Sequence, residues 1–305
     1  MNSQTLSWSY SRVDVFTRCR LEYYYAYYGA YGGWEKDASK EKRELNILKH
    51  TKNRYAWMGD MVHGLIEEFM QEFAKGRTLQ SEEFLKKADQ RMRREYKDSR
   101  DQLYRKDPGR YNGLVEHENS IAVTNEQWKR IHENVMGCAA NFYYTDFYKQ
   151  HITTGGKDIL RIEKLDSFDL DGIKVYARPD VAVKGTDTLE IIDWKTGSEN
   201  DEHEFQLCFY ALYGVRKLGV LPERIKASLV YLKDNTKTEA SMDAAKLERA
   251  AEYLKSTFEG IKAFHEETKQ GVDVNALPRA KAKSTCSLCR FQKMCKSNPD
   301  LTPLV

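Results

Sequence analysis

The 305-residue chain has no uncharged apolar run near the ~18 residues that a transmembrane helix needs, so we expect no membrane-spanning segment and no membrane partner. It has no internal repeat and no low-complexity tract. Residues 1–16 lack a basic stretch followed by an apolar one, the pattern of a secretory signal. We therefore expect a cytoplasmic protein.

Cysteine is also scarce, with six residues in the whole chain, which excludes a disulfide-stapled miniprotein. In a reducing compartment, clustered cysteines favour metal binding over disulfides. The content of 41% hydrophobic and 31% charged residues, with a mean hydropathy of −0.72, excludes disordered and collagen-like chains. The composition predicts one large globular domain or two ordinary ones.

The net charge of +3 is small, but its distribution is uneven. Residues 86–110 hold ten Lys and Arg against five Asp and Glu, and residues 276–305 hold six against one. These two basic segments favour a surface that binds a polyanion. A solvated helix face is the alternative interpretation of 86–110.

Periodicity separates a helical N-terminal half from a mixed C-terminal half. Apolar residues spaced by three and four predict helices over 55–73, 81–104, 125–148, 205–218 and 244–264, and residues 7–28 fit a helix loosely. Short β-branched segments predict strands over 159–170, 173–183, 189–195 and 225–232, of which the first two form a hairpin. This order predicts an α/β fold with a mixed central sheet flanked by helices.

Two aspartates and a lysine form the candidate chemical site. Asp193 and Lys195 share one face of the strand 189–195, and Asp180 follows Pro179 on the preceding strand. Burying these charges in an apolar strand is costly without a partner, and a divalent cation between the aspartates would supply one. Oxygen ligands of this kind suit Mg²⁺ or Mn²⁺. A turn at Asp180 and an exposed Asp193–Lys195 ion pair are the alternatives.

Pro179-Asp180 followed by Asp193-x-Lys195 resembles the signature of PD-(D/E)XK nucleases. His63, on the helix 55–73, resembles the histidine of RecB-type members, although by itself it would be an ordinary helix histidine. Gln206-x-x-x-Tyr210 resembles their Gln-x-x-x-Tyr motif, and all these residues occur in the RecB order. The resemblance implies a restriction-endonuclease-like core.

Three clustered cysteines, Cys286, Cys289 and Cys295, stand near the C-terminus, and Cys19 stands near the start of the chain. This division resembles the iron–sulfur staple of the CRISPR-associated RecB-like exonucleases and of the AddB nuclease domain. There a [4Fe–4S] cluster holds the chain ends together as an N/C-terminal lobe. Relatives often have proline after the first cysteine, whereas Arg20 follows here. From ligand chemistry alone, four thiolates suit either an iron–sulfur cluster or a structural zinc.

The resemblance also implies a role for each site residue. Asp180 would bridge the metal ions, Asp193 and the Trp194 carbonyl would complete the first metal site, and His63 would bind a second ion. Lys195 would orient the attacking water, and Glu163 would support the site through a water. Gln206 and Tyr210 would position the DNA strand. We therefore expect the domains 1–54 with the first cluster cysteine, 55–75 with His63, the nuclease core at 159–270 and a cysteine lobe at 271–305. The resemblance does not explain residues 76–158, which we expect to be a basic helical insertion.

The resulting expectation is a Mg²⁺- or Mn²⁺-dependent DNA nuclease. The resemblance implies an exonuclease on single-stranded or frayed DNA ends, acting in CRISPR adaptation or in DNA recombination and repair, with an integrase or a helicase as partner. A non-catalytic DNA-binding or scaffolding module that retains the fold is the alternative.

Overall fold

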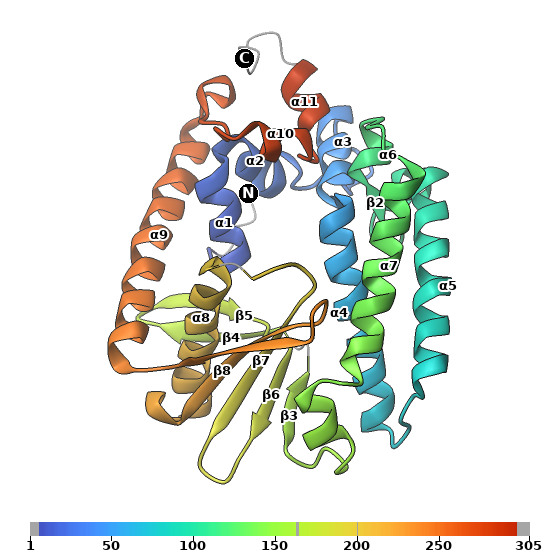
Figure 1. Ribbon diagram of the computed structural model, residues 1–305. Coiled ribbons are helices and arrows are strands. Elements are labelled where there is room, and N and C mark those ends of the chain that lie inside the picture. The colour runs from blue at the N-terminus through green and yellow to red at the C-terminus, as the bar shows by residue number, and fades with distance from the viewer. Residues whose placement is uncertain (1–5, 163–164, 200, 298–305) are drawn as a thin grey trace. The chain divides into compact units, whose positions relative to one another are not determined.

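The computed structural model describes residues 6–162, 165–199 and 201–297, and the chain divides into two compact units (Figure 1). The sheet unit comprises Met1–Val13, Met61–Ala88 and Asn134–Thr268. The helical unit comprises Asp14–Asp60, Asp89–Glu133 and Lys269–Val305. In the described residues, no helix combines the length and the apolar character needed to cross a membrane.

A five-stranded sheet forms the centre of the sheet unit, in the order β3-β6-β7-β8-β9. The strands are β3 (Ile159–Ile162), β6 (Val181–Lys184), β7 (Leu189–Lys195), β8 (Ile225–Tyr231) and β9 (Thr236–Ser241). β7 and β8 are parallel and the other neighbours are antiparallel, so the sheet is mixed as the sequence predicts. Helix α8 (Asp201–Leu218) makes the crossover that a parallel pair requires.

A separate hairpin pairs β4 (Asp166–Leu170) with β5 (Ile173–Ala177). Its two turn residues, Asp171 and Gly172, have φ angles of 53° and 85°, as a tight hairpin turn between twisted strands requires. The predicted hairpin turn is therefore confirmed, but the prediction of two long strands is wrong. β5 ends before Pro179, which has no N–H to donate to a strand ladder, and β6 begins after it.

Helices cover both faces of the five-stranded sheet. On one face, α8 lies against β7, since a Cβ at Gly214 would come within 2.9 Å of the Leu189 side chain. On the other face, the ring centroid of the buried Trp194 lies 5.8 Å from that of Phe142, the last residue of α7 (Asn125–Phe142). It lies 5.4 Å from the ring centroid of Phe147, which follows α7. Helix α9 (Ala244–Gln270) packs on α8 through Tyr253 and Phe205, whose ring centroids are 5.2 Å apart.

The predicted helices form, with several different ends. Helix α4 (Arg54–Ala74) matches its prediction closely, whereas α5 (Ser81–Arg100) ends early because Gln102 adopts a left-handed conformation with φ 56°. Helix α7 ends at Phe142 instead of near 148, and α9 continues to Gln270. The sequence analysis missed α3 (Lys40–Lys49) and β9.

The N-terminal aromatic segment divides at Cys19 into α1 (Tyr10–Arg18), α2 (Arg20–Tyr24) and a π-helical turn (Tyr25–Gly29). Cys19 is extended, with φ −156° and ψ 109°, and its Sγ accepts a hydrogen bond from the Glu22 N–H at 3.4 Å. This thiol therefore caps α2, which explains the break in the helix.

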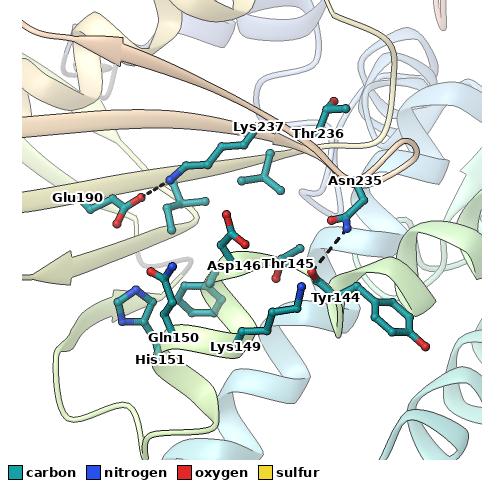
Figure 2. Close-up of a pocket in the computed structure, with 13 residues that line it drawn as sticks. Tyr144, Thr145, Asp146, Lys149, Gln150, His151, Glu190, Asn235, Thr236 and Lys237 are labelled. Atoms are coloured by element: carbon teal, nitrogen blue, oxygen red, sulfur yellow. Dashed lines mark hydrogen bonds and ion pairs between the residues drawn. The ribbon is translucent and has the colours of Figure 1, made fainter.

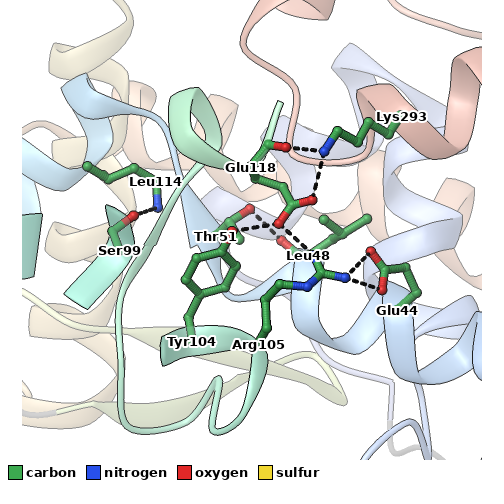
Figure 3. Close-up of polar contacts among 9 residues, drawn as sticks. All are labelled: Glu44, Leu48, Thr51, Ser99, Tyr104, Arg105, Leu114, Glu118 and Lys293. Carbon is green, nitrogen blue, oxygen red and sulfur yellow. Dashed lines mark hydrogen bonds and ion pairs between the residues drawn. The ribbon is translucent and has the colours of Figure 1, made fainter. Parts of the chain in front are cut away.

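A buried carboxylate, Glu118 at the end of α6 (Val115–Glu118), connects three segments of the helical unit (Figure 3). It accepts hydrogen bonds from the Tyr104 hydroxyl and the Arg105 guanidinium, both at 2.6 Å, and from the Lys293 ammonium at 3.1 Å. Arg105 also reaches Glu44 of α3 at 2.7 Å. Burial raises the pKa of Glu118, but these hydrogen bonds outweigh burial and the net pKa is lowered, so the carboxylate stays charged.

Candidate active site

Strand pairing brings the two predicted aspartates to the same place in the sheet. Val181 of β6 pairs with Ile192 of β7, so Asp180, one residue before Val181, lies beside Asp193. Both side chains are buried, with residue exposures of 4% and 3%. Two buried carboxylates at one position repel each other and need cationic or hydrogen-bonding partners.

Both carboxylate oxygens of Asp180 have a partner. Its Oδ2 accepts a hydrogen bond from the backbone N–H of Trp194 at 2.7 Å, and its Oδ1 lies 3.1 Å from Nδ1 of His63. His63 belongs to the part of α4 that lies in the sheet unit. The imidazole therefore reaches the aspartate pair from a residue 117 positions earlier in the chain.

Lys195 connects the second aspartate to helix α8. Its Nζ lies 2.7 Å from Oδ2 of Asp193 and donates to Oε1 of Gln206 at 2.9 Å. Nε2 of Gln206 in turn donates to the Tyr210 hydroxyl at 2.8 Å. Burial, together with the charges of Asp193 and Asp180, raises the pKa of Tyr210 well above its ordinary value, so this phenol stays neutral.

The structure thus brings together His63, Asp180, Asp193, Lys195, Gln206 and Tyr210. Glu163, the supporting acid expected from the sequence, lies outside the described residues. The Trp194 side chain is buried on the opposite face of the sheet, while its backbone N–H holds Asp180. The sequence analysis missed this main-chain donor because a backbone N–H leaves no signal in residue type.

The donor chemistry of the site fits a hard divalent cation, since two buried carboxylates lie side by side and an imidazole contacts one of them. Oδ2 of Asp193 is buried and accepts no hydrogen bond of good geometry, although the Lys195 ammonium is close. That oxygen keeps acceptor capacity for a metal ligand bond. As the side chains stand, no three His, Cys, Asp or Glu residues in the described part of the chain surround a common ion position.

A second polar pocket, of about 110 Å³, lies on the opposite face of the sheet from Asp193 (Figure 2). It is lined by Glu190 and Ile192 of β7, which alternate with Ile191 and Asp193 along the strand. Its Lys237 is already paired with Glu190 at 3.0 Å. This pocket contains none of the predicted site residues.

In the helical unit, the four predicted cluster cysteines line one cavity of about 60 Å³. They are Cys19, Cys286, Cys289 and Cys295, and all four are free thiols. Burial, with the charge of Glu22, raises the pKa of Cys289 to about 12. The two other cysteines, Cys138 and Cys208, are buried in the sheet unit and do not line this cavity.

Comparisons with known proteins bear on the family. The profile of the PD-(D/E)XK nuclease superfamily matches residues 7–296. No curated protein matches the chain. Among solved structures, one titled "Crystal structure of SSO0001" is 16% identical, with 62% of this chain and 93% of that chain covered and a TM-score of 0.28. Because the superfamily match spans nearly the whole chain, including Asp180 and Asp193-x-Lys195, this protein belongs to the PD-(D/E)XK nuclease superfamily.

Proposed function

We propose that the chain is a divalent-metal-dependent DNA nuclease whose active site contains Asp180, Asp193, Lys195 and His63. The observation that carries the proposal is the continuous set of contacts linking these residues. His63 touches Asp180, which is held by the Trp194 N–H, and Asp193 touches Lys195. These groups come from α4, β6, β7 and the segments beside them, and burial in the sheet holds them together.

When bound, Mg²⁺ or Mn²⁺ would lower the pKa of a water and offset charge on the scissile phosphate. Asp180 and Asp193 would hold the ion, with His63 adding an imidazole beside Asp180. The Trp194 N–H donates to Oδ2 of Asp180, and His63 lies beside Oδ1, so both contacts hold this carboxylate in position.

Lys195 would orient the attacking water and stabilise negative charge developing on the phosphate. Its ammonium forms an ion pair with Asp193 and a hydrogen bond to Gln206, and these two contacts restrict where it can lie. Gln206 is itself held by the neutral Tyr210. In this proposal the pair on α8 sets the position of the lysine before substrate arrives.

The finer assignment comes from the RecB-like and cysteine motifs. It is an exonuclease on single-stranded or frayed DNA ends, acting in CRISPR adaptation or in DNA recombination and repair, with an integrase or a helicase as partner. What supports it here is the order of His63, Asp180, Asp193-x-Lys195 and Gln206-x-x-x-Tyr210 along the chain.

The nuclease proposal is tested with 5′- and 3′-labelled single- and double-stranded DNA in Mg²⁺, Mn²⁺ or EDTA. Lys195→Ala and Asp193→Asn should lower the cleavage rate by roughly 10²–10³-fold, because each removes a charged group from the transition state. The control is Lys184→Ala, which removes an exposed lysine from the neighbouring strand β6 and should cleave as the wild type does.

Each outcome of that assay has a meaning. Wild-type protein that binds DNA but never cuts it with either ion would favour the scaffolding alternative. Internal cuts in circular DNA would contradict the exonuclease assignment and leave the nuclease assignment intact. Unchanged cleavage by Lys195→Ala would overturn the proposed site.

We further propose that Cys19, Cys286, Cys289 and Cys295 bind a [4Fe–4S] cluster. The four thiols line one cavity of the helical unit. Four thiolates suit either an iron–sulfur cluster or a zinc ion, and the division into one early and three late cysteines, which resembles the iron–sulfur staple, favours the cluster.

Metal analysis of anaerobically purified protein tests the cluster. We expect bound iron and sulfide with broad visible absorption, both lost in Cys289→Ser because one of four ligands is gone. The control Cys138→Ser changes a buried thiol of the sheet unit and should keep the colour. Colourless protein with one zinc per chain would contradict the cluster and leave the nuclease proposal unaffected.

A further inference from the structure

The helical unit contains an open groove of about 330 Å³ that the proposed chemistry does not use. We call it the aromatic groove. It is lined by Trp57 of α4, by Met92, Arg93 and Tyr96 of α5, and by Asn125, Trp128, Lys129 and His132 of α7. Its size is within the range of ~300–1,000 Å³ that is typical of ligand sites.

The floor and wall of the groove are apolar and mostly aromatic. Trp57 and Met92 are buried, and Glu95 fixes the Trp57 indole by accepting its N–H at 2.8 Å. Tyr96 and Trp128 are half-buried, with ring centroids 5.1 Å apart at an interplanar angle of 78°. Rings that are held in place and still partly exposed offer a surface for another flat ring.

The rim of the groove is cationic. The side chains of Arg93 and Lys129 are 73% and 67% exposed, and no carboxylate lines the groove. Lys129 lies 3.6 Å from Glu133, one turn further along α7, which offsets part of its charge. Asp89, on the next turn of α5, accepts from Arg93 and contacts His132, both at 2.8 Å, so it holds both groups at the rim while offsetting part of their charge.

On α5, Lys97 follows Arg93 by four residues, so it lies on the same side of the helix as that rim residue. Lys97 is exposed and has no ion pair with any described residue. Some other cations of the basic segment 86–110 are paired, for example Arg91 with Glu95 and Arg105 with Glu44 and Glu118. Lys97 therefore adds uncompensated positive charge on the Arg93 side of α5.

We propose that the aromatic groove binds single-stranded DNA, with a base stacked on the Tyr96–Trp128 wall and the flanking phosphates at Arg93 and Lys129. Aromatic platforms edged by cations suit this ligand because every base has a flat face and every linkage has a charge. Bases in a duplex are already stacked, so the groove selects unpaired strands. The inference rests on the proposed action on DNA and adds where the strand is held.

The test is fluorescence anisotropy of labelled oligo(dT), an abasic oligomer of equal length and a duplex, all in EDTA so that nothing is cleaved. Trp128→Ala should weaken oligo(dT) binding by roughly tenfold or more, since stacking on one aromatic is lost. Trp34→Ala, which removes an exposed tryptophan outside the groove, is the matched control and should bind as the wild type does. The abasic oligomer should bind more weakly than oligo(dT) and be indifferent to Trp128→Ala.

Lys129→Glu provides a second variant whose exposed position leaves folding intact, should Trp128→Ala fail a thermal-unfolding check. It should weaken binding and reduce the slope of log K against log salt by about 0.7, the value for one lost phosphate contact on a single strand. Lys75→Glu, on a lysine that is 69% exposed and paired with Glu72 just after the end of α4, is the charge control.

Equal oligo(dT) binding by wild type, Trp128→Ala and Lys129→Glu would overturn the inference, as would equal losses in the two control variants. Tight duplex binding that depends on Trp128 would also contradict it. If the wild type never cuts DNA but Trp128-dependent strand binding persists, the groove stands and the nuclease proposal fails. If cleavage depends on Lys195 but strand binding ignores Trp128, only the groove fails.

Discussion

Asp180 uses its two carboxylate oxygens differently. A main-chain N–H holds Oδ2, and an imidazole from a distant helix lies beside Oδ1. A side chain held in this way cannot rotate freely, so it can present the same oxygen to each ligand. The motif Pro179-Asp180 identifies the residue. The different partners of its two oxygens, however, depend on β7 lying alongside.

Gln206 and Tyr210 were expected to position DNA, and the structure connects them to Lys195. The amide of Gln206 bridges the lysine ammonium and the Tyr210 hydroxyl. The two residues are four apart on α8, so one helix face presents both to the site. They are therefore candidates for positioning residues that act through the lysine.

For Gln206→Leu we predict a kcat about 10- to 100-fold lower with little change in KM, because the ammonium loses an oriented acceptor while DNA contacts stay. Gln206→Glu, which keeps an oxygen acceptor for Lys195, should recover part of the loss. The measurement is steady-state cleavage of labelled DNA.

The control for this prediction is Gln71→Leu, which removes an exposed glutamine that contacts Glu67 on α4. A raised KM with unchanged kcat in Gln206→Leu would instead support direct positioning of DNA by this residue.

At the scale of elements, β7 makes the site possible because it has partners on both edges. Antiparallel pairing with β6 sets Asp193 beside Asp180, and parallel pairing with β8 requires a crossover, which α8 provides. That crossover carries Gln206 and Tyr210 back over the strand end. The order and direction of the strands therefore bring together motifs that are separate along the chain.

Glycine positions in two other elements give a prediction about packing. A Cβ on Gly33 would lie 2.6 Å from the Asn46 Cβ and still closer to the Lys42 carbonyl of α3, so backbone must move. Gly33→Ala should lower the free energy of unfolding by about 1–3 kcal/mol. Gly137 is exposed on α7, and a Cβ there would meet no neighbour within 4 Å. Gly137→Ala should therefore raise the free energy of unfolding by about 0.5–1 kcal/mol, because glycine disfavours helix.

Urea unfolding of the two variants, monitored by circular dichroism, measures both effects. The pair is matched, since each change adds one methyl group to a glycine. Equal stability of the two variants would contradict the close approach of Gly33 to α3.

At the scale of the whole molecule, one buried and two half-buried tyrosines link stability to alkaline pH. Burial and the Glu118 hydrogen bond raise the pKa of Tyr104, and burial raises the pKa of Tyr143 and Tyr148. The unfolded chain releases these protons near pH ~10, earlier than the folded chain does. Their contribution to stability is therefore complete below that pH and is lost as pH rises further.

We predict that the free energy of unfolding falls steeply above pH ~10 and that Tyr143→Phe makes this fall shallower, since one shifted group is removed. At neutral pH the same variant should lose about 0.5–1.5 kcal/mol, because the hydroxyl no longer donates to the Leu79 carbonyl. Urea unfolding across pH 7–11 measures both effects.

The neighbouring Tyr144→Phe is the control, since its side chain is 62% exposed and removing its hydroxyl should change neither the neutral-pH stability nor the alkaline slope. Identical pH profiles for wild type and Tyr143→Phe would contradict the assignment of this slope to Tyr143.

The sequence by itself determined the helices with strong three- and four-residue periodicity, the turn at Asp171-Gly172, the mixed sheet and the motif residues of the site. These depend on local spacing and on residue chemistry, which the chain displays directly. The four cysteines were also recognisable by their spacing.

Tertiary structure decided the rest. It divided the predicted strand 173–183 at Pro179, used the Trp194 N–H to hold Asp180, and linked Lys195 to Gln206. It also gathered Trp128 and Tyr96 from separate helices into one groove wall. Each of these depends on which segments pack together over long separations in the chain, and no local pattern encodes that choice.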